Sequence, residues 1–375
     1  MRYIGVDLHK TKIAACYLTE GKYTHKNFKI DEIDKFKATL KFEDELCFEA
    51  TTNSAWFNRQ CASLVKRIVV VDTVRFKVIS SSHNKTDKND AKTLAFHLSK
   101  DMLPETKVKE MMFQDLQSLF NTRKLLVKQR TMLKNELYGF LLSHGIIIKA
   151  TDLRSIIGLK RVSAIAINTT ADTNIATMIS LIKSINEQIK TLDAKLKECS
   201  KSLSGFNNLN SIDGLGCNTI IMLLATIGNI ANFNSYKQLC SYLGLVPIVR
   251  NSNETIKHSG ISKKGNATLR GNLIECAMVA ITKNHKLNKF YEKLRATKGH
   301  GKAIVATTRK LVQLIYFTLK YSWFFEDELT PNRLTSKIRE NNNDIQKDNS
   351  EIKTKKVFSN QIRKTLEINW LADAI

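Results

Sequence analysis

An unbroken heptad pattern in the middle of the chain constrains the fold more than any other feature. Apolar residues recur there at alternating intervals of three and four: Ile175, Met178, Ile182, Ile185, Ile189, Leu192, Leu196 and Cys199. A repeat of this length is typical of a long helix with one narrow apolar face, and such a helix must pack against another.

An earlier segment offers a partner for this helix. Its apolar seam contains Leu116, Leu119, Arg123, Leu126, Arg130, Leu133, Leu137 and Phe140. Arg123 and Arg130 occupy core positions, so we expect each to find a polar partner or to face a polyanion. Residues 143–171, with Gly145 and Gly158, are expected to form a turn region with short helices. An intramolecular helical hairpin and an intermolecular coiled coil fit the pattern equally well.

The first hundred residues follow a different pattern, in which short apolar strands alternate with helices. Strands are expected at 3–8, 12–18, 23–30, 45–50 and 67–71, and helices at 32–40, 54–66 and 87–99. Three strands followed by helix, strand, helix, strand and helix is the order of the ribonuclease H fold.

Four carboxylates lie at the ends of these expected elements. Asp7 and Glu49 belong to two apolar strands, whereas Asp87 and Asp90 begin a helix. A carboxylate at the end of an apolar strand is costly to desolvate without positive charge beside it. Asp87 and Asp90 share one helix face, where they repel each other unless a cation lies between them. The four residues predict a site for two Mg²⁺ ions, with Mn²⁺ able to substitute, that acts on a phosphodiester.

Glycines mark a second kind of motif at Ser211–Ile220. Gly214 and Gly216 stand between two helical patterns, which predicts a helix-hairpin-helix. Glycine lets backbone amides approach a DNA phosphate without a side chain in the way. The alternative is a tight interhelical turn without a ligand.

A second glycine-rich segment covers residues 244–265. The basic residues around its glycines are Lys257, Lys263, Lys264 and Arg270. Their position near an expected helix start suits contacts to a phosphate backbone, and Ser262 resembles the N-cap of that helix. Ser252 lies in an expected loop beside basic groups, where its hydroxyl is a weak candidate for a nucleophile on chemistry alone.

Composition indicates the class of partner. The 375 residues include 59 Lys and Arg against 35 Asp and Glu, a net charge of +24, which favours polyanions. A Lys-rich composition from an AT-rich genome is the alternative explanation. Seven cysteines without a Cys-x-x-Cys pair argue for a reducing compartment and against structural zinc. Neither a signal peptide nor a membrane-spanning stretch is expected, so we expect a cytoplasmic protein with no membrane partner.

Taken in order, these motifs resemble the DEDD-type insertion-sequence transposases. This is the family of RuvC-like serine recombinases that includes bridge-RNA-guided recombinases and pilin-gene invertases. The segments that carry the resemblance are Tyr3–Lys10, Glu49–Thr51, Lys85–Ala91, the helix-hairpin-helix and Gly244–Gly265. The resemblance implies a RuvC-like catalytic domain at 1–100, a coiled-coil domain at 101–204 and a mainly helical transposase domain at 205–325. Residues 326–375 are expected to form a partly disordered tail.

The resemblance also implies roles for individual residues. The four carboxylates would be the catalytic metal ligands, and Ser252, which follows the Gly-Leu-x-Pro stretch, would be the catalytic serine. Ser259 is the alternative nucleophile. The chain departs from the family pattern at Thr52 and Asn253, where glycine is common in the family.

The implied function is the excision and insertion of a mobile element. It would proceed by Mg²⁺-dependent strand cleavage and exchange through a phosphoserine intermediate. The implied partners are DNA, a structured guide RNA and further copies of the chain, as a dimer or tetramer. The alternative is a RuvC-like nuclease or junction resolvase that uses water, and a third hypothesis is a non-catalytic nucleic-acid binder.

Overall fold

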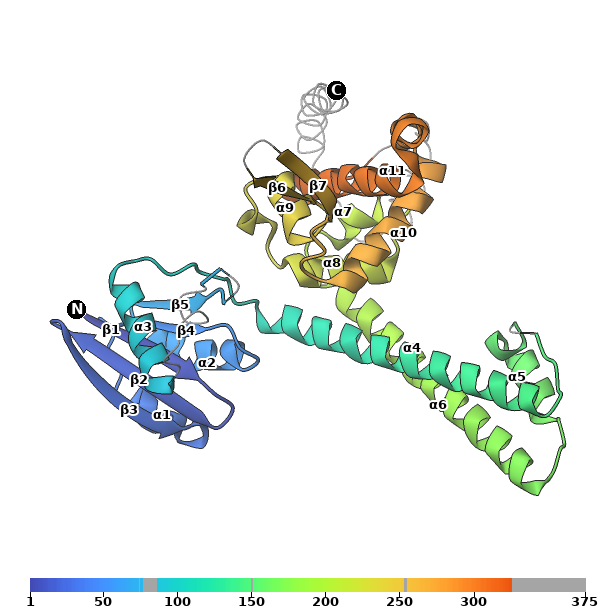
Figure 1. Ribbon diagram of the computed structural model, residues 1–375, viewed down its shortest axis with the longest axis horizontal. Coiled ribbons are helices and arrows are strands. Elements are labelled where there is room, and N and C mark those ends of the chain that lie inside the picture. Colours follow the sequence, from blue (N-terminus) through green and yellow to red (C-terminus); the bar gives the residue numbers. More distant parts are fainter. Residues whose placement is uncertain (74, 77–85, 150, 253–254, 326–375) are drawn as a thin grey trace, which may run out of the picture. The chain divides into compact units, whose positions relative to one another are not determined.

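The computed structural model describes residues 1–325 apart from 74, 77–85, 150 and 253–254, and only the backbone at 249–252 and 255–259. The predicted tail at 326–375 lies outside the described residues. The chain divides into two compact units, a first unit at Met1–Met112 and a second at Phe113–Ile375. Each is described by itself (Figure 1).

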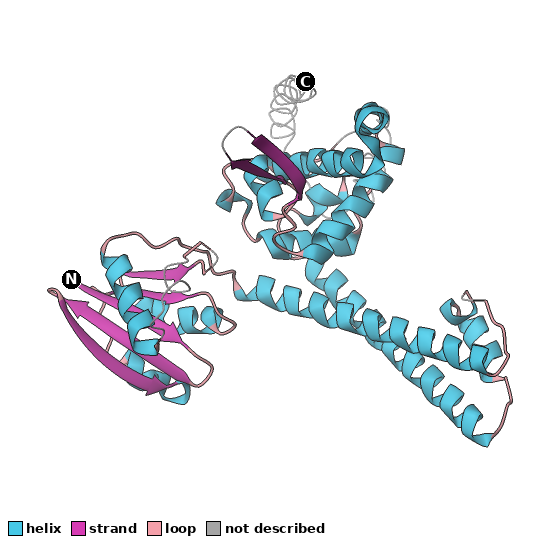
Figure 2. Ribbon diagram, viewed as in Figure 1, coloured by secondary structure: helices cyan, strands magenta, loops and turns pink. Residues whose placement is uncertain are grey.

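The first unit is built on a five-stranded mixed sheet. Its strands are β1 (Arg2–Leu8), β2 (Lys12–Thr19), β3 (Lys22–Lys29), β4 (Glu45–Glu49) and β5 (Arg67–Val71), and its helices are α1 (Ile33–Lys37), α2 (Ser54–Cys61) and α3 (Asp87–Ser99), with 3-10 turns at Ile30–Glu32 and Ala62–Leu64. The strand order is β3-β2-β1-β4-β5, in which β1–β4 and β4–β5 are parallel and the other pairs antiparallel. The predicted succession of strands and helices is confirmed (Figure 2).

The two faces of this sheet are covered by different helices. Even-numbered residues of β1, such as Ile4 and Val6, share a core with Phe36 of α1 and Phe57 of α2. Gly5 lies on the opposite face, where an added Cβ would collide with the backbone of α3 at the Ala91 carbonyl and the Ala95 amide. Because glycine has no Cβ, α3 can lie directly on β1.

The second unit begins with a helical hairpin. Its long helices are α4 (Met111–Ser143) and α6 (Thr169–Ser200), and between them lie the 3-10 turn η3 (Asp152–Arg154) and the helix α5 (Ile156–Ser163). Leu137 and Leu141 of α4 share a buried core with Ile175 and Ile182 of α6. The predicted seam therefore closes within one chain, as an antiparallel hairpin (Figure 1).

Both arginines of the earlier seam have polar partners on α6, as predicted. Arg123 donates from Nε and Nη2 to the Asp193 carboxylate at 2.7 and 3.1 Å. Arg130 donates from Nη1 to the Asn186 side-chain oxygen at 3.0 Å.

The remainder of the second unit is mainly helical. Its helices are α7 (Phe206–Asn210), α8 (Cys217–Ile227), α9 (Tyr236–Tyr242), α10 (Ala267–Lys283) and α11 (His285–Tyr321), with a 3-10 turn at Ile230–Asn232 and the strands β6 (Pro247–Ser252) and β7 (Thr255–Ile261). Every residue of α8 from Thr219 to Ile227 is buried. Leu116 and Phe120 of α4 and Leu196 of α6 belong to the same core, so the base of the hairpin is packed into this helical body.

The expected loop around Ser252 is wrong, because β6 and β7 form an antiparallel pair there, in which Ser252 pairs with Thr255. The two strands contain the β-branched residues Ile248, Val249, Thr255 and Ile256, which favour extended backbone. The expected helix cap is also wrong. Asn266, rather than Ser262, caps α10, since its side-chain oxygen accepts from the amides of Thr268 and Leu269 at 3.0 and 3.1 Å.

Among the helices that the structure describes, none combines the length and the apolar character of a membrane span.

Candidate active site

Two of the four predicted carboxylates leave the sheet at neighbouring positions. β1 and β4 run parallel, and Val6 is paired with Phe48. The following residues, Asp7 and Glu49, therefore lie next to each other in register. Side chains alternate along a strand, so both belong to the face that carries Gly5 and α3.

The other two carboxylates open α3. Thr86 caps this helix by accepting a hydrogen bond from the Asn89 amide at 3.2 Å. Asp87 precedes Ala91 by one turn, and Ala91 contacts the sheet at Gly5. The sheet-facing side of the helix thus continues through Asp87 and Asp90, which the helix dipole also favours at an N-terminus.

The carboxylates from the sheet and from α3 meet at one edge of the sheet. The pKa of Asp7 is raised, foremost by burial and further by the negative charges of Asp87 and Asp90, while His9 opposes the shift. Ligand atoms of Asp7 and Asp87 lie within 4.8 Å of each other, together with one of His9. Asp90 is on the same side of α3 as Asp87, one turn before Leu94, which packs on the sheet.

His9, which follows β1, and Lys12, which begins β2, contact these carboxylates. His9 Nε2 is 3.1 Å from Asp7 Oδ2 and 3.3 Å from Asp87 Oδ1. Lys12 Nζ donates to Asp87 Oδ2 at 2.9 Å. The pKa of Asp87 is lowered, foremost by the hydrogen bond from Lys12 and less by His9, against the opposing effect of burial. The chain itself supplies part of the charge compensation that the carboxylates require.

The donor set fits a divalent cation. Ligand atoms of Asp7, His9 and Asp87 all lie within 4.8 Å of one another. Carboxylate oxygens and an imidazole nitrogen are both ligands of divalent cations in proteins.

Sequence reasoning missed His9 and Lys12, and also two residues that hold the loops of the site. Asn53 Nδ2 donates to the His9 carbonyl at 3.1 Å. Ser54 Oγ donates to the Glu49 carbonyl at 3.1 Å and accepts from the Thr51 amide at 2.5 Å. The loop after β4 is thereby tied to the loop after β1. The sequence could have pointed to these residues, because each lies within a few positions after one of the predicted carboxylates.

The two glycines of the expected helix-hairpin-helix have different surroundings. Gly214 has φ +96°, and a Cβ there would lie 2.8 Å from the Ala280 amide of α10, so this glycine is needed for internal packing. Gly216 precedes α8 and has open space where a Cβ would be. Gly216 is the position of the two at which a ligand can approach the backbone.

The second glycine segment forms the base of the β6–β7 hairpin. A Cβ on Gly244 would collide with the Lys264 carbonyl, and one on Gly265 with the Tyr242 carbonyl. Arg270 is 8% exposed, and its Nη1 donates to the Lys264 carbonyl at 2.9 Å, so it braces this base from inside. Lys263 and Lys264 are exposed on the same turn. The two exposed lysines are therefore available to contact a phosphate, whereas the buried arginine is not.

The two candidate nucleophiles are on different strands of this hairpin. Ser252 ends β6, and Ser259 lies within β7, as does the predicted DNA-contacting Lys257. The side chains of these three residues lie outside the described part of the structure.

Comparison with known families gives two matches. Residues 4–146 match the family model of IS110-type DEDD transposases, which is described as a transposase. Residues 206–292 match the model described as the transposase IS116/IS110/IS902 family. The first match contains all four carboxylates and the second contains the β6–β7 hairpin.

Individual relatives agree with these matches. The chain is 29% identical to the transposase for insertion sequence element IS1111A of Coxiella burnetii, over 63% of this chain and 67% of the relative. It is 24% identical to the pilin gene-inverting protein of Moraxella lacunata, over 87% of this chain and 98% of the relative. It is also 24% identical to the transposase for insertion sequence element IS1328 of Yersinia enterocolitica, over 74% and 83%.

Proposed function

The chain belongs to the IS110/IS116 family of DEDD transposases, and on that premise we propose how its two units divide the chemistry of DNA transposition. The first unit would hold the metal-dependent centre on a RuvC-like fold, with which the mixed sheet is compatible. The second would supply the nucleophile. The observation that carries the proposal is the approach of Asp7 and Asp87 within 4.8 Å of each other, beside the end of β4.

Asp7, Glu49, Asp87 and Asp90 would hold the divalent cations, for which we propose two Mg²⁺ ions with Mn²⁺ as a substitute. When bound, the cations supply Lewis-acid stabilisation of the phosphate oxygens. The residues of the chain keep four negative charges together for this purpose. His9 and Lys12 lower the cost of holding them so close, since both approach Asp87 within 3.3 Å.

Ser252 would be the nucleophile. Its hydroxyl oxygen forms a bond to the scissile phosphorus and loses its proton to water, while the bond from phosphorus to the bridging sugar oxygen breaks and that oxygen takes up a proton. Attack by a sugar hydroxyl from a second strand reverses these steps and frees the serine. Because the phosphodiester energy is conserved in the phosphoserine bond, strand exchange needs no nucleotide cofactor.

Contacts to DNA would come from the second unit. The open backbone at Gly216 and the exposed Lys263 and Lys264 support this role. Lys257 would also contact the DNA backbone, a role that only its positive charge supports. Gly214 and Arg270 pack inside the unit, and we propose structural roles for them.

The remaining partners follow from the chemistry. The carboxylates and Ser252 belong to different units, so strand cleavage requires both units at one DNA site, from one chain or from two. Joining two DNA sites favours a dimer or tetramer. A structured guide RNA would place sequence recognition in base pairing, as in other RNA-guided systems, and the net charge of +24 supports such a partner.

The test is a search for a denaturation-resistant protein–DNA adduct. Purified protein is incubated with Mg²⁺, junction DNA of its element and co-expressed flanking RNA. We expect an adduct with the wild type, and its loss in Ser252→Ala and in Asp90→Ala by about a thousandfold. Ser259→Ala, in the same hairpin, is the matched control and should retain the adduct.

Two other outcomes would reject Ser252 as the nucleophile. Free cut ends without an adduct, retained in Ser252→Ala, would indicate the hydrolytic nuclease that uses water. An adduct lost in Ser259→Ala but retained in Ser252→Ala would assign the nucleophile to the other strand.

A further inference from the structure

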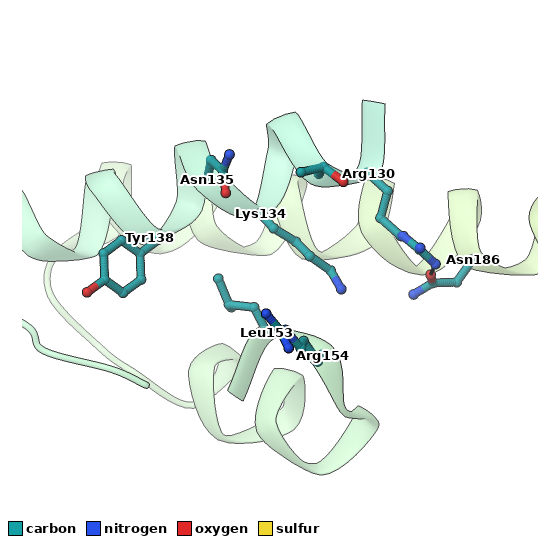
Figure 3. A pocket seen from close by; sticks show the side chains of 8 residues that line it. Arg130, Lys134, Asn135, Tyr138, Leu153, Arg154 and Asn186 are labelled. Atoms are coloured by element: carbon teal, nitrogen blue, oxygen red, sulfur yellow. Dashed lines mark hydrogen bonds between the residues drawn. The ribbon is translucent and has the colours of Figure 1, made fainter. Parts of the chain in front are cut away.

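A cavity of about 500 Å³ lies on the helical hairpin of the second unit, away from the predicted catalytic residues in the sequence. Its walls come from three elements: Arg130, Lys134 and Tyr138 of α4, Leu153 and Arg154 of η3, and Asn186 of α6. Cavities of this size bind small molecules or parts of larger ones. Figure 3 shows Lys134 extending from α4 toward the segment that carries Leu153 and Arg154.

The charge of this cavity is one-sided. Three of its eight lining side chains are cationic and none is a carboxylate. Arg130 donates one of its N–H groups to Asn186, which is neutral. The neighbouring Asp152 is engaged elsewhere, since its carboxylate accepts from the Lys149 amide at 3.1 Å and lies 3.8 Å from Arg161.

The three cations affect one another. The pKa of Lys134 is lowered, foremost by burial and further by the positive charges of Arg130 and Arg154. A bound anion would remove the repulsion that this shift reports.

The scaffold beneath the cavity is firmly packed. Leu153 is 3% exposed and shares a core with Leu137 and Leu141 of α4. Gly158 of α5 lies against the backbone of Asp152, where an added Cβ would collide with the Asp152 carbonyl. These contacts hold η3 against α4, so the position of Arg154 opposite Lys134 is built into the fold.

We propose that this cavity binds backbone phosphate of a single-stranded segment of nucleic acid. Arg130, Lys134 and Arg154 would contact the phosphate oxygens, and Tyr138 offers an aromatic face to a base. A single strand suits the site because a strand that bends can enter a cavity between helices. A duplex, which is stiff over about 50 nm, presents its phosphates on a convex surface. The ribose and deoxyribose backbones share the phosphate chemistry, so the source is distinguished by experiment.

The experiment measures binding of the full chain to labelled oligonucleotides of one sequence, as single-stranded RNA, single-stranded DNA and duplex DNA. Lys134→Gln, Arg154→Gln and the double variant are compared with Lys190→Gln, an exposed lysine of α6 outside the cavity. We expect the double variant to bind single strands roughly tenfold more weakly. The slope of log affinity against log salt should fall by about 0.7 for each lost phosphate contact.

The comparison of probes identifies the strand. An effect on RNA alone assigns the site to RNA, one on DNA alone assigns it to DNA, and equal effects show recognition of phosphate without the sugar. Unchanged affinity and salt slope in the double variant would overturn the proposal, as would an equal loss in Lys190→Gln. A loss confined to duplex DNA would also contradict it.

Two further measurements keep the result interpretable. Thermal unfolding shows whether each variant is folded, and Arg154→Gln alone is the reserve variant because Arg154 is exposed. The proposal rests on a nucleic-acid substrate but not on the serine chemistry. The effect of the double variant should therefore be the same when Asp7 is also replaced by Asn, a background in which we expect no cleavage.

Discussion

The carboxylate cluster of the first unit and the cavity of the second both gather like charges, but their charge is balanced differently. Asp7 and Asp87 are contacted by His9 and Lys12, which the same chain supplies. In the cavity, Lys134 and Arg154 have no carboxylate among the lining residues. In the carboxylate cluster, a bound metal ion can take the place of the Lys12 ammonium group beside Asp87. In the cavity, the repulsion between the cationic side chains can fall only when an anion binds.

The two clusters share one structural device, a glycine that allows close contact between elements. Gly5 lets α3 lie on β1, and Gly158 lets α5 lie on the backbone of η3. In each cluster the charged residues are next to the place where the glycine contacts the neighbouring backbone. The tight packing of the two backbone segments holds the like charges together against their repulsion.

Replacing Gly5 by Ala should have the largest effect. Its Cβ would collide with the backbone of α3, so the helix must shift and carry Asp87 and Asp90 away from Asp7. We expect the first unit to lose about 2 kcal/mol of stability and DNA cleavage to fall by about a hundredfold, as for a small misplacement of catalytic groups. Urea unfolding and the adduct assay measure the two effects.

Gly139→Ala is the matched control. Gly139 lies inside α4 with open space around the position of a Cβ, so the added methyl group should stabilise the helix by about 1 kcal/mol. Full cleavage activity in Gly5→Ala would mean that the position of α3 does not set the carboxylate geometry.

Replacing Lys12 by Gln removes the positive charge that the chain itself places beside Asp87. The carboxylate cluster would then resemble the cavity, whose cationic side chains have no carboxylate among the lining residues. Lys12 donates to the Asp87 carboxylate at 2.9 Å, and the same carboxylate belongs to the group that could hold a divalent cation. Both side chains are 42% exposed, so the ion pair between Lys12 and Asp87 contributes little free energy. We therefore expect Mn²⁺ to bind to the variant only about two- to fivefold more tightly than to the wild type. Calorimetric titration with Mn²⁺ measures it. Weaker binding in the variant would show that Lys12 supports the cation site instead of competing with it.

Sequence alone could anticipate the first cluster because its geometry follows from simple periods. Strand alternation assigns Asp7 and Glu49 to one face, and helical spacing places Asp87 and Asp90 on one side of α3. His9 and Lys12 could not be predicted in the same way, because their contacts with Asp87 depend on how the β1–β2 connection folds back onto α3.

The second unit was harder to anticipate because its key contacts are between segments. The run from Arg250 to Thr255 is polar and lacks alternation, so the pairing of β6 with β7 left no periodic signal. Arg270 was expected to contact phosphate from its charge. It is buried because Gly244 and Gly265 bring two loops together over it, a contact that no local pattern records.

The smallest expected effect concerns the two arginines between α4 and α6, only one of which pairs with a charged side chain among the described residues. Arg123 pairs with the carboxylate of Asp193, which also accepts from Asn218, whereas Arg130 pairs with an amide. The pKa of Asp193 is lowered, foremost by the hydrogen bond from Arg123, against the opposing effect of burial. Because a lowered pKa stabilises the fold only while the group is ionised, this stabilisation is complete above the unfolded pKa of about 3.9 and is lost as pH falls through the folded value.

Arg123→Met should therefore lower the free energy of unfolding by about 0.5–1 kcal/mol at neutral pH, a small value because Asp193 is 36% exposed. The difference from wild type should shrink as pH falls below about 4. Arg130→Met is the control, since Asn186 does not titrate and its effect should be the same at both pH values. Urea unfolding of the three proteins at pH 7 and at about pH 3.5 measures this. A loss in Arg123→Met that stays constant with pH would mean that Arg123 contributes through the packing of its side chain and not through the charge of Asp193.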